Sequence, residues 1–178
     1  MNIILGITGS VATILTPKVV KSLKELGHQV KIVRTYYSQF FWWDYTLDLF
    51  KDVKLYDDGD EFEHFYKKGD PVLHIELREW ADVLIIAPLS ANTLSKMSRG
   101  IADNLLTSLV LAWRRDHPII IAPAMNTVMW TNPLTEENLK KVISVYKCKV
   151  AYPQSKVLAC GEEGDGAMAQ ISDILKLL

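Results

Sequence analysis

Three short and almost wholly apolar runs constrain the fold of this chain more than any other feature. They lie at residues 3–7 (IILGI), 82–88 (DVLIIAP) and 118–125 (PIIIAPAM). A strand buried on both faces shows such a continuous run, whereas a half-buried strand alternates apolar and polar residues. We therefore expect these runs to form a parallel sheet that helices cover on both faces.

Segments with helical periodicity lie between the apolar runs. In residues 17–26 apolar side chains recur at helical spacing, and Gly27 follows as a stop signal. Further helices are predicted over residues 74–81, 90–116 with a break near Gly100, 135–147 and 171–178, and further strands over residues 29–35, 50–56 and 149–153. This alternation predicts an α/β fold, a Rossmann-like (flavodoxin-like) three-layer sandwich with a central parallel sheet.

Length and charge narrow the class of protein. A chain of 178 residues suits a single domain, residues 1–178, with a substantial core. Its net charge of −1 gives no reason to expect a nucleic-acid or membrane-surface partner. No apolar stretch reaches the roughly 18 residues of a membrane helix, and the run at residues 3–7 lacks the basic segment of a signal peptide.

The two cysteines, Cys148 and Cys160, are too few for a disulfide framework and do not form a metal knuckle. We therefore expect reduced thiols, a cytoplasmic protein and no bound metal. Cys148 lies at a lysine-rich helix end and is predicted to be structural. Cys160 lies in a glycine-rich segment, where it is either an inert buried side chain or a reactive thiol on a mobile flap.

Small polar residues follow the predicted strands, at the edge of the sheet where α/β proteins bind ligands. After the first strand, backbone amides and the Ser10 hydroxyl either hold a phosphate or form only a tight turn. Ser90 opens a similar group, residues 90–93, and is either a ligand contact or a helix cap. Four such loops on one sheet edge indicate a binding site more strongly than any one of them alone.

Two further polar residues lie close to predicted strands. Asn126 follows a buried strand, where its amide either orients a carboxylate or carbonyl group or forms a turn. His74 stands at the start of a predicted helix, and a lone histidine beside apolar residues is more often packed than catalytic. Both therefore stay open candidates on spacing alone.

Four segments together resemble the homo-oligomeric flavin-containing cysteine decarboxylases. They are GSVA at residues 9–12, the long segment from DPVLHIELREW to GIADNLL at residues 70–106, PAMNTVMW at residues 123–130 and LACGEEGDGAMA at residues 158–169. The last two are specific, whereas GSVA is not. The resemblance covers nearly the whole chain in the same order, and residues 35–60 match poorly.

The resemblance implies FMN as cofactor, contacted by loops at the carboxyl edge of the sheet. The implied contacts are Gly9, Ser10, Val11, Thr35, Ser38, Ser90, Ala91, Asn92, Thr93 and Ala124. It also implies that His74 is the catalytic base, that Asn126 holds the substrate carboxylate, and that Cys160 is the acid. A flap at about residues 153–168 would close over the substrate through Val157, Leu158 and Ala159.

The implied activity is decarboxylation of 4'-phosphopantothenoylcysteine to 4'-phosphopantetheine in coenzyme A biosynthesis. The implied assembly is a homotrimer with sites between subunits. Peptidyl-cysteine decarboxylases are the nearest alternative, and they stop at an enethiol without an acid cysteine, so Cys160 argues against them. A flavin prenyltransferase is a weaker alternative, because it would not be expected to carry PAMNTVMW together with the cysteine flap. A non-catalytic regulatory subunit that binds a phosphatase is also weaker, because such relatives typically lack one catalytic residue, whereas His74, Asn126 and Cys160 are all present.

Overall fold

The central sheet is parallel throughout. The structure is a computed structural model, and it describes residues 1–41, 50–63, 67–157 and 163–178. Within these residues the sheet has six strands in the order β3-β2-β1-β4-β5-β6. Their bounds are β1 Asn2–Ile7, β2 Gln29–Arg34, β3 Lys54–Tyr56, β4 Val83–Leu89, β5 Ile119–Pro123 and β6 Lys149–Val150.

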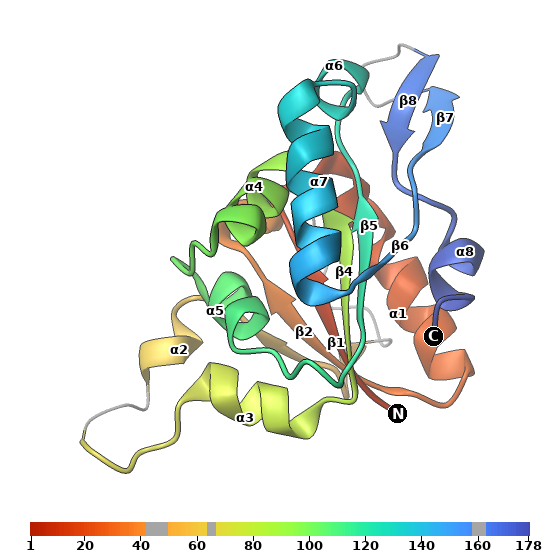
Figure 1. Cartoon of the computed structure of the whole chain (residues 1–178). Helices are drawn as coiled ribbons and strands as arrows, with labels where there is room; N and C mark the ends of the chain where they lie inside the picture. The colour runs from red at the N-terminus through yellow and green to blue at the C-terminus, as the bar shows by residue number, and fades with distance from the viewer. Residues whose placement is uncertain (42–49, 64–66, 158–162) are drawn as a thin grey trace.

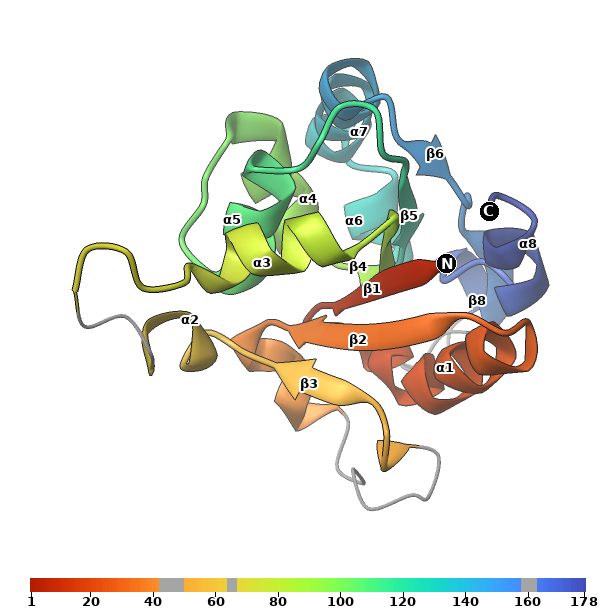
Figure 2. The same ribbon diagram turned by 90° about the horizontal axis from the view of Figure 1, so that it is seen from below.

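Helices cover both faces of this sheet (Figures 1 and 2). One face carries α1 (Thr16–Glu25) and α8 (Ile171–Leu175), and the other carries α3 (Leu73–Trp80), α4 (Ala91–Arg99), α5 (Leu105–Leu111) and α7 (Pro133–Tyr146). The predicted three-layer α/β sandwich is therefore confirmed.

The two cores follow from the alternation of side chains along the strands. In β1, Ile3 and Leu5 pack beneath α1 and α8, whereas Ile4 packs in the core beneath α3, α4 and α5. All three are fully buried. Because both faces of β1 are covered, every side chain from Ile3 to Ile7 can be apolar, which explains the continuous run in the sequence.

Most predicted elements are present, and the differences lie at their ends. Gly27 and Gly100 end α1 and α4 in the left-handed conformation, with φ of 79° and 69°, as their positions predict. The strand predicted over residues 149–153 is wrong beyond Val150. The amide of Ala151 still donates to the carbonyl oxygen of Ile121 (2.9 Å), but Pro153 has no amide with which to continue the ladder. The strand predicted over residues 50–56 begins only at Lys54, because residues 50–53 form a turn.

A hairpin that the strand prediction missed stands at the carboxyl edge of the sheet. Strands β7 (Gln154–Val157) and β8 (Glu163–Ala167) pair antiparallel, and they lie beside α6 (Thr127–Trp130) at the top of Figure 1. The N-terminus lies at the bottom of that view, so the strand ends with their loops lie at the top. Within the described residues, no helix is both long and apolar enough to cross a membrane.

Candidate active site

Thr8, the first residue after β1, fixes the end of that strand to the end of β4. Its hydroxyl donates to the carbonyl oxygen of Pro88 (2.8 Å) and accepts from the backbone amide of Ser90 (2.8 Å). Thr8 is fully buried, so water does not compete for either bond. The loops that begin at Thr8 and at Ser90 therefore lie side by side.

Further hydrogen bonds bring the loop after β5 to the same place. The Ser10 hydroxyl donates to the carbonyl oxygen of Ala124 (3.2 Å), and the amide of Ala124 donates to the carbonyl oxygen of Leu89 (2.9 Å). Ser10 also caps η1 (Val11–Leu15), because its hydroxyl accepts from the amide of Ala12 (3.4 Å). Three of the loops predicted to contact FMN thus meet at the carboxyl edge.

The loop after β2 packs directly on Gly9. A Cβ at Gly9 would lie only 2.8 Å from the Cβ of Tyr37, so the close approach of η2 (Tyr36–Phe40) requires glycine here. Thr35 and Ser38 are buried, and the Ser38 hydroxyl donates to the carbonyl oxygen of Thr35 (2.8 Å). Among the predicted contacts of these two loops, Val11 is exposed and Gly9 is partly exposed, whereas the side chain of Ser38 is directed inward.

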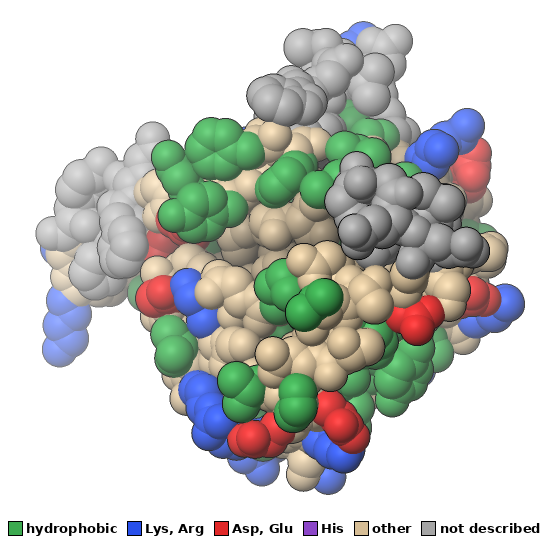
Figure 3. All heavy atoms as spheres, turned by 90° about the horizontal axis from the view of Figure 1, so that it is seen from above, with side chains coloured by type: hydrophobic (Ala, Val, Ile, Leu, Met, Phe, Trp, Pro, Cys, Tyr) green, Lys and Arg blue, Asp and Glu red, His purple; other side chains and the backbone are tan. Residues whose placement is uncertain are grey.

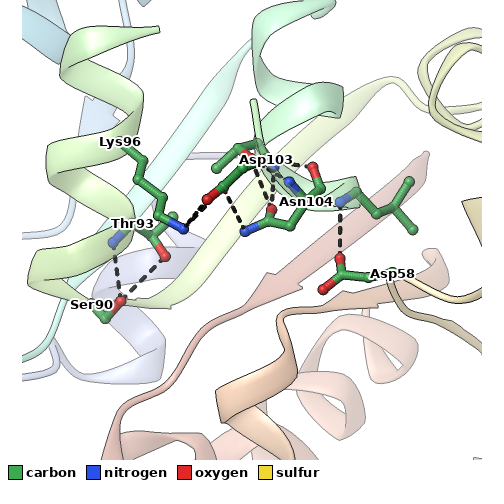
Figure 4. Close-up of polar contacts among 8 residues, drawn as sticks. Asp58, Ser90, Thr93, Lys96, Asp103 and Asn104 are labelled. Carbon is green, nitrogen blue, oxygen red and sulfur yellow. Dashed lines mark hydrogen bonds and ion pairs between the residues drawn. The ribbon is translucent and has the colours of Figure 1, made fainter. Parts of the chain in front are cut away.

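The predicted contacts at residues 90–93 form the start of α4. Ser90 caps this helix, since its hydroxyl accepts from the amide of Thr93 (3.3 Å) and donates to the Thr93 hydroxyl (3.2 Å), as Figure 4 shows. Ser90 and Thr93 are buried, Ala91 is partly buried and Asn92 is exposed. Among the described residues the Asn92 side chain has no hydrogen-bond partner, which leaves it open to a ligand.

The segment between α4 and α5 is held by charged and polar contacts (Figure 4). Lys96 pairs with Asp103 (2.7 Å), and the Asn104 side chain caps α5. The Asp58 carboxylate accepts from the amide of Leu105 (2.9 Å), which fixes the turn after β3 to the start of α5. Burial raises the pKa of the Asp58 carboxyl above its ordinary value, and the bond from Leu105 opposes that shift.

Asn126 lies on the surface directly after β5 and caps α6. Its side-chain oxygen accepts from the amide of Met129 (2.8 Å), so the cap fixes the orientation of the side-chain amide. Its nitrogen donates no hydrogen bond to any other described residue. An oriented and exposed N–H donor of this kind can donate to a carboxylate oxygen.

The β7–β8 hairpin is packed closely against the loop that carries Asn126. A Cβ at Gly166, which has a φ of 131°, would lie 2.3 Å from the carbonyl oxygen of Met125, and a Cβ at Gly164 would lie 2.1 Å from the hydroxyl of Thr127. The amide of Met125 in turn donates to the carbonyl oxygen of Gly166 (3.0 Å). Two glycines of the segment GEEGDGAMA are thus needed for contact with the candidate site.

The predicted flap residues are described only in part. Val157 is the last residue of β7, and Leu158, Ala159 and Cys160 lie outside the described residues. Cys148 is buried, and burial raises the pKa of its thiol to about 11, as expected for a structural cysteine.

His74 is not brought together with Ser10, Ser90 or Asn126 within this chain. It stands in the first turn of α3, a helix low in Figure 1, far below α6 and the hairpin. Its Nδ1 contacts a carboxylate oxygen of Glu61 on α2 (Asp60–Glu63), and its backbone amide donates to the other oxygen (3.2 Å). The chain thus carries two separate groups of candidate residues, one at the carboxyl edge and one on α2 and α3.

Several large hydrophobic side chains are exposed around the carboxyl edge. Figure 3 looks onto this edge and shows hydrophobic side chains gathered among backbone and small polar groups. Those with high exposure come from η1, η2 and α6: Val11, Ile14, Tyr36, Tyr37, Phe40, Val128 and Met129. Val128 is 77% exposed and Tyr37 is 66% exposed, and exposed apolar groups of this kind are typical of surfaces that bind a ligand or another chain.

No sequence pattern predicted a role for Thr8, which accepts from the amide of Ser90, or for Glu61, which contacts His74. A threonine at a strand end is common, and only the pairing of β1 with β4 places Ser90 beside it. Glu61 lies 13 positions before His74 and on another element, so no local pattern connects them.

Known proteins resemble this chain over nearly its whole length. The family described as Flavoprotein matches residues 1–178. A phosphopantothenoylcysteine decarboxylase of Mus musculus is 41% identical over 98% of this chain and 83% of that protein. A probable thymidylate synthase of Schizosaccharomyces pombe is 45% identical over 98% of this chain, but the match spans only 28% of that protein, so its name carries no weight for this chain.

Solved structures show the same likeness. A mutant of a PPC decarboxylase complexed with pantothenoylaminoethenethiol has a TM-score of 0.93 and 46% identity, covering 98% of this chain and 94% of that one. The FMN-binding protein AtHal3 has a TM-score of 0.88 and 47% identity, covering 98% and 92%. A peptidyl-cysteine decarboxylase has a TM-score of 0.79 and only 27% identity, covering 99% and 96%. The chain belongs to the flavoprotein family that includes the phosphopantothenoylcysteine decarboxylases.

Proposed function

We propose that this chain is an FMN-dependent carboxy-lyase that converts 4'-phosphopantothenoylcysteine to 4'-phosphopantetheine in coenzyme A biosynthesis. The observation that carries the proposal is the likeness, over nearly both whole chains, to a PPC decarboxylase bound to pantothenoylaminoethenethiol. That ligand is an aminoethenethiol, the compound expected when a cysteine has lost its carboxylate but has not been reduced again.

The residues at the carboxyl edge fit FMN. Backbone amides at the start of η1 and the Ser10 hydroxyl offer donors for a phosphate. The exposed amide of Asn92 offers a further donor, and the apolar face around Val11 suits a flat aromatic ring. We assign the FMN contacts to Gly9, Ser10, Val11, Thr35, Ser38, Ser90, Ala91, Asn92, Thr93 and Ala124.

The chemistry needs an electron sink before CO2 can leave. In the substrate the carboxylate stands on a carbon that has only an amide nitrogen and a CH2–SH group, so a carbanion there would not be stabilised. FMN, when bound, supplies a reversible hydride acceptor for the carbon that bears the thiol. Loss of that hydride and of the thiol proton turns CH2–SH into a C=S group, which can accept the electron pair that departing CO2 leaves behind.

The chain's own residues would move the protons and hold the substrate. His74 would take the thiol proton. The Asn126 amide would hold the carboxylate so that the breaking bond is aligned with the C=S group. Cys160 would then protonate the enethiolate on carbon as the hydride returns to the carbon that it left. The balance is one CO2 released and one proton taken up, without net oxidation.

The hairpin would act as the lid of this site. The proposed flap, at about residues 153–168, would close Val157, Leu158 and Ala159 over the substrate and exclude water from the enethiolate. The packing of Gly164 and Gly166 on residues 125–127 supports this, since it holds strand β8 of the hairpin beside Asn126.

The active assembly would be a homotrimer in the cytoplasm, with sites between subunits. The exposed hydrophobic face at the carboxyl edge supports an interface there. The separation of His74 from Asn126 within one chain supports a site that a second subunit completes. The free thiol of Cys148 agrees with a reducing compartment.

The decisive experiment compares two substrates with the FMN-loaded protein. We expect CO2 release from 4'-phosphopantothenoylcysteine, none from a peptide with a C-terminal cysteine, and 4'-phosphopantetheine as the product by mass spectrometry. Release from the peptide alone would favour the peptidyl-cysteine decarboxylases, and release from neither would favour a regulatory subunit.

Two variants test the assigned proton transfers. Cys160→Ser should release CO2 but accumulate the enethiol, and normal amounts of 4'-phosphopantetheine would contradict the acid role of Cys160. His74→Asn should release no CO2 while FMN stays bound, and full activity would exclude His74 as the base.

A further inference from the structure

We propose that Glu61 is a positioning residue for the base His74, a role that rests on the proposed function. Its carboxylate holds the imidazole through Nδ1, which leaves Nε2 as the nitrogen that takes the substrate proton. The two residues thus form a carboxylate–histidine pair built from α2 and α3.

Both oxygens of the Glu61 carboxylate bind the same residue. One contacts Nδ1 of His74, and the other accepts from the backbone amide of His74 (3.2 Å). The Glu61 side chain is only 10% exposed, whereas the His74 side chain is 23% exposed. The carboxylate is therefore shielded from water, while the imidazole keeps an accessible edge.

This contact determines which nitrogen can act as a base. A carboxylate accepts hydrogen bonds and donates none, so Nδ1 must carry a proton when it faces Glu61. In the neutral imidazole the lone pair then lies on Nε2, for which no partner exists among the described residues. The same negative charge would stabilise the imidazolium that forms once His74 has taken a proton.

The turn before α2 is fixed to the body of the fold, which holds Glu61 in place. Asp57 pairs with Arg34 at the end of β2 (2.7 Å), and its amide donates to the carboxylate of Asp60 (2.7 Å). The Asp58 carboxylate accepts from the amide of Leu105 at the start of α5 (2.9 Å). Asp57 and Asp58, which shortly precede Glu61, are thus held to β2 and to the start of α5.

A simpler role for Glu61 is to cap α3, because the N-cap residue Val72 makes no side-chain cap. The two roles differ in what a glutamine does. Glu61→Gln keeps an oxygen for the backbone amide of His74, but it removes the charge and adds an NH2 group that can face Nδ1 and favour the wrong tautomer. Glu61→Ala removes the cap as well.

The test measures steady-state kinetics, FMN affinity and thermal unfolding of these variants. We expect Glu61→Gln to lower kcat at least about tenfold, up to the loss seen for His74→Asn, with FMN affinity and unfolding temperature unchanged. Glu79→Gln is the control. Glu79 is on α3, as His74 is, and among the described residues it pairs only with Arg78 and Arg114. It should leave kcat unchanged.

A second measurement does not depend on activity. Nitrogen-15 NMR of the resting protein should show His74 with its proton on Nδ1 in the wild type, and a shift toward the Nε2–H form in Glu61→Ala. The proposal would be overturned if His74→Asn abolished activity but Glu61→Gln kept full kcat. It would also be overturned if NMR found the Nε2–H form of His74 in the wild type. A protein that fails to decarboxylate 4'-phosphopantothenoylcysteine would refute the proposed function, while the NMR result would still decide the Glu61–His74 contact.

Discussion

The backbone amide of Ser90 donates a 2.8 Å hydrogen bond to the buried hydroxyl of Thr8, 82 positions earlier in the chain. The same hydroxyl donates to Pro88, so one side chain fixes the loop after β1 to the loop after β4. Residues from both loops are assigned to the FMN site, and Thr8 itself need not touch the cofactor.

Thr8→Val should therefore weaken both the fold and FMN binding. The variant keeps the shape of the side chain but leaves the Ser90 amide and the Pro88 carbonyl without a partner in a buried place. We expect the free energy of unfolding to fall by about 1–3 kcal/mol, measured by urea denaturation. Thr8→Ser, which keeps the hydroxyl, is the control, and equal stability of the two variants would show that the bond contributes little.

Asn126→Asp should reduce activity strongly while α6 stays folded. Aspartate still caps α6 through its oxygen. It loses the N–H donor, and it would place a negative charge where the proposed function puts the substrate carboxylate. We expect kcat/KM to fall about 100-fold, from the loss of a hydrogen bond to a charged group.

Asn132→Asp provides a matched control for this variant. Asn132 caps α7 in the same way, with its oxygen accepting from the amide of Leu134 (2.9 Å). This variant should keep wild-type kinetics, and an equal loss in both variants would point to a general effect of added charge.

Gly166→Ala should detach the hairpin from the loop that carries Asn126. The new methyl group would lie 2.3 Å from the carbonyl oxygen of Met125, so the backbones must separate. We expect the Met125 amide, which donates to Gly166, to exchange with solvent at least about tenfold faster, together with a higher KM.

The control for this prediction is Gly27→Ala. Gly27 also has a positive φ, 79°, but a Cβ there meets nothing within 4 Å. It should cost only about 1 kcal/mol of backbone strain and leave the exchange of Met125 unchanged. Unaltered exchange in Gly166→Ala would disprove the close packing.

Cys148 should resist alkylation in the folded protein. Burial raises the pKa of its thiol to about 11, so almost no thiolate is present at pH 8. In a Cys160→Ser background, mass spectrometry should find no modification by iodoacetamide before denaturation and one modified thiol after it. Rapid labelling of the folded chain would refute the burial of Cys148.

The same thiol makes stability depend on pH in the alkaline range. Between its ordinary pKa of 9.0 and the folded value of about 11, the unfolded chain has lost the proton that the folded chain keeps. Unfolding then releases a proton, so stability falls as pH rises, by at most about 1.4 kcal/mol per pH unit. Below pH 9 this contribution is constant. Cys148→Ala should remove this contribution, whereas the raised pKa of Tyr146 should still lower stability above pH 10, as urea denaturation over that range would show.

Local pattern was enough for the core of the fold. The apolar runs at β1, β4 and β5 are buried on both faces, and a strand in that position cannot carry polar side chains. Gly100 divides α4 from α5 because it adopts a left-handed conformation that ends a helix. The loops at the carboxyl edge were predictable for the same reason, since parallel strands bring their ends together.

Local patterns could not predict contacts between segments that are distant in the sequence. Strand β8 has the sequence EGDGA, which strand propensity disfavours, and it exists because it pairs with β7 and packs on residues 125–127. The contact between Glu61 and His74 likewise depends on the docking of α2 against α3.

The sequence by itself determined the layered parallel sheet and the family to which the chain belongs, because burial on two faces leaves a local signature. Only the tertiary structure decided that Thr8 joins two site loops, that Glu61 holds His74, and that His74 stands apart from Asn126 within one chain. The physical reason is that these relationships depend on how elements distant in the sequence are packed around the whole sheet, and local residue patterns do not record that packing.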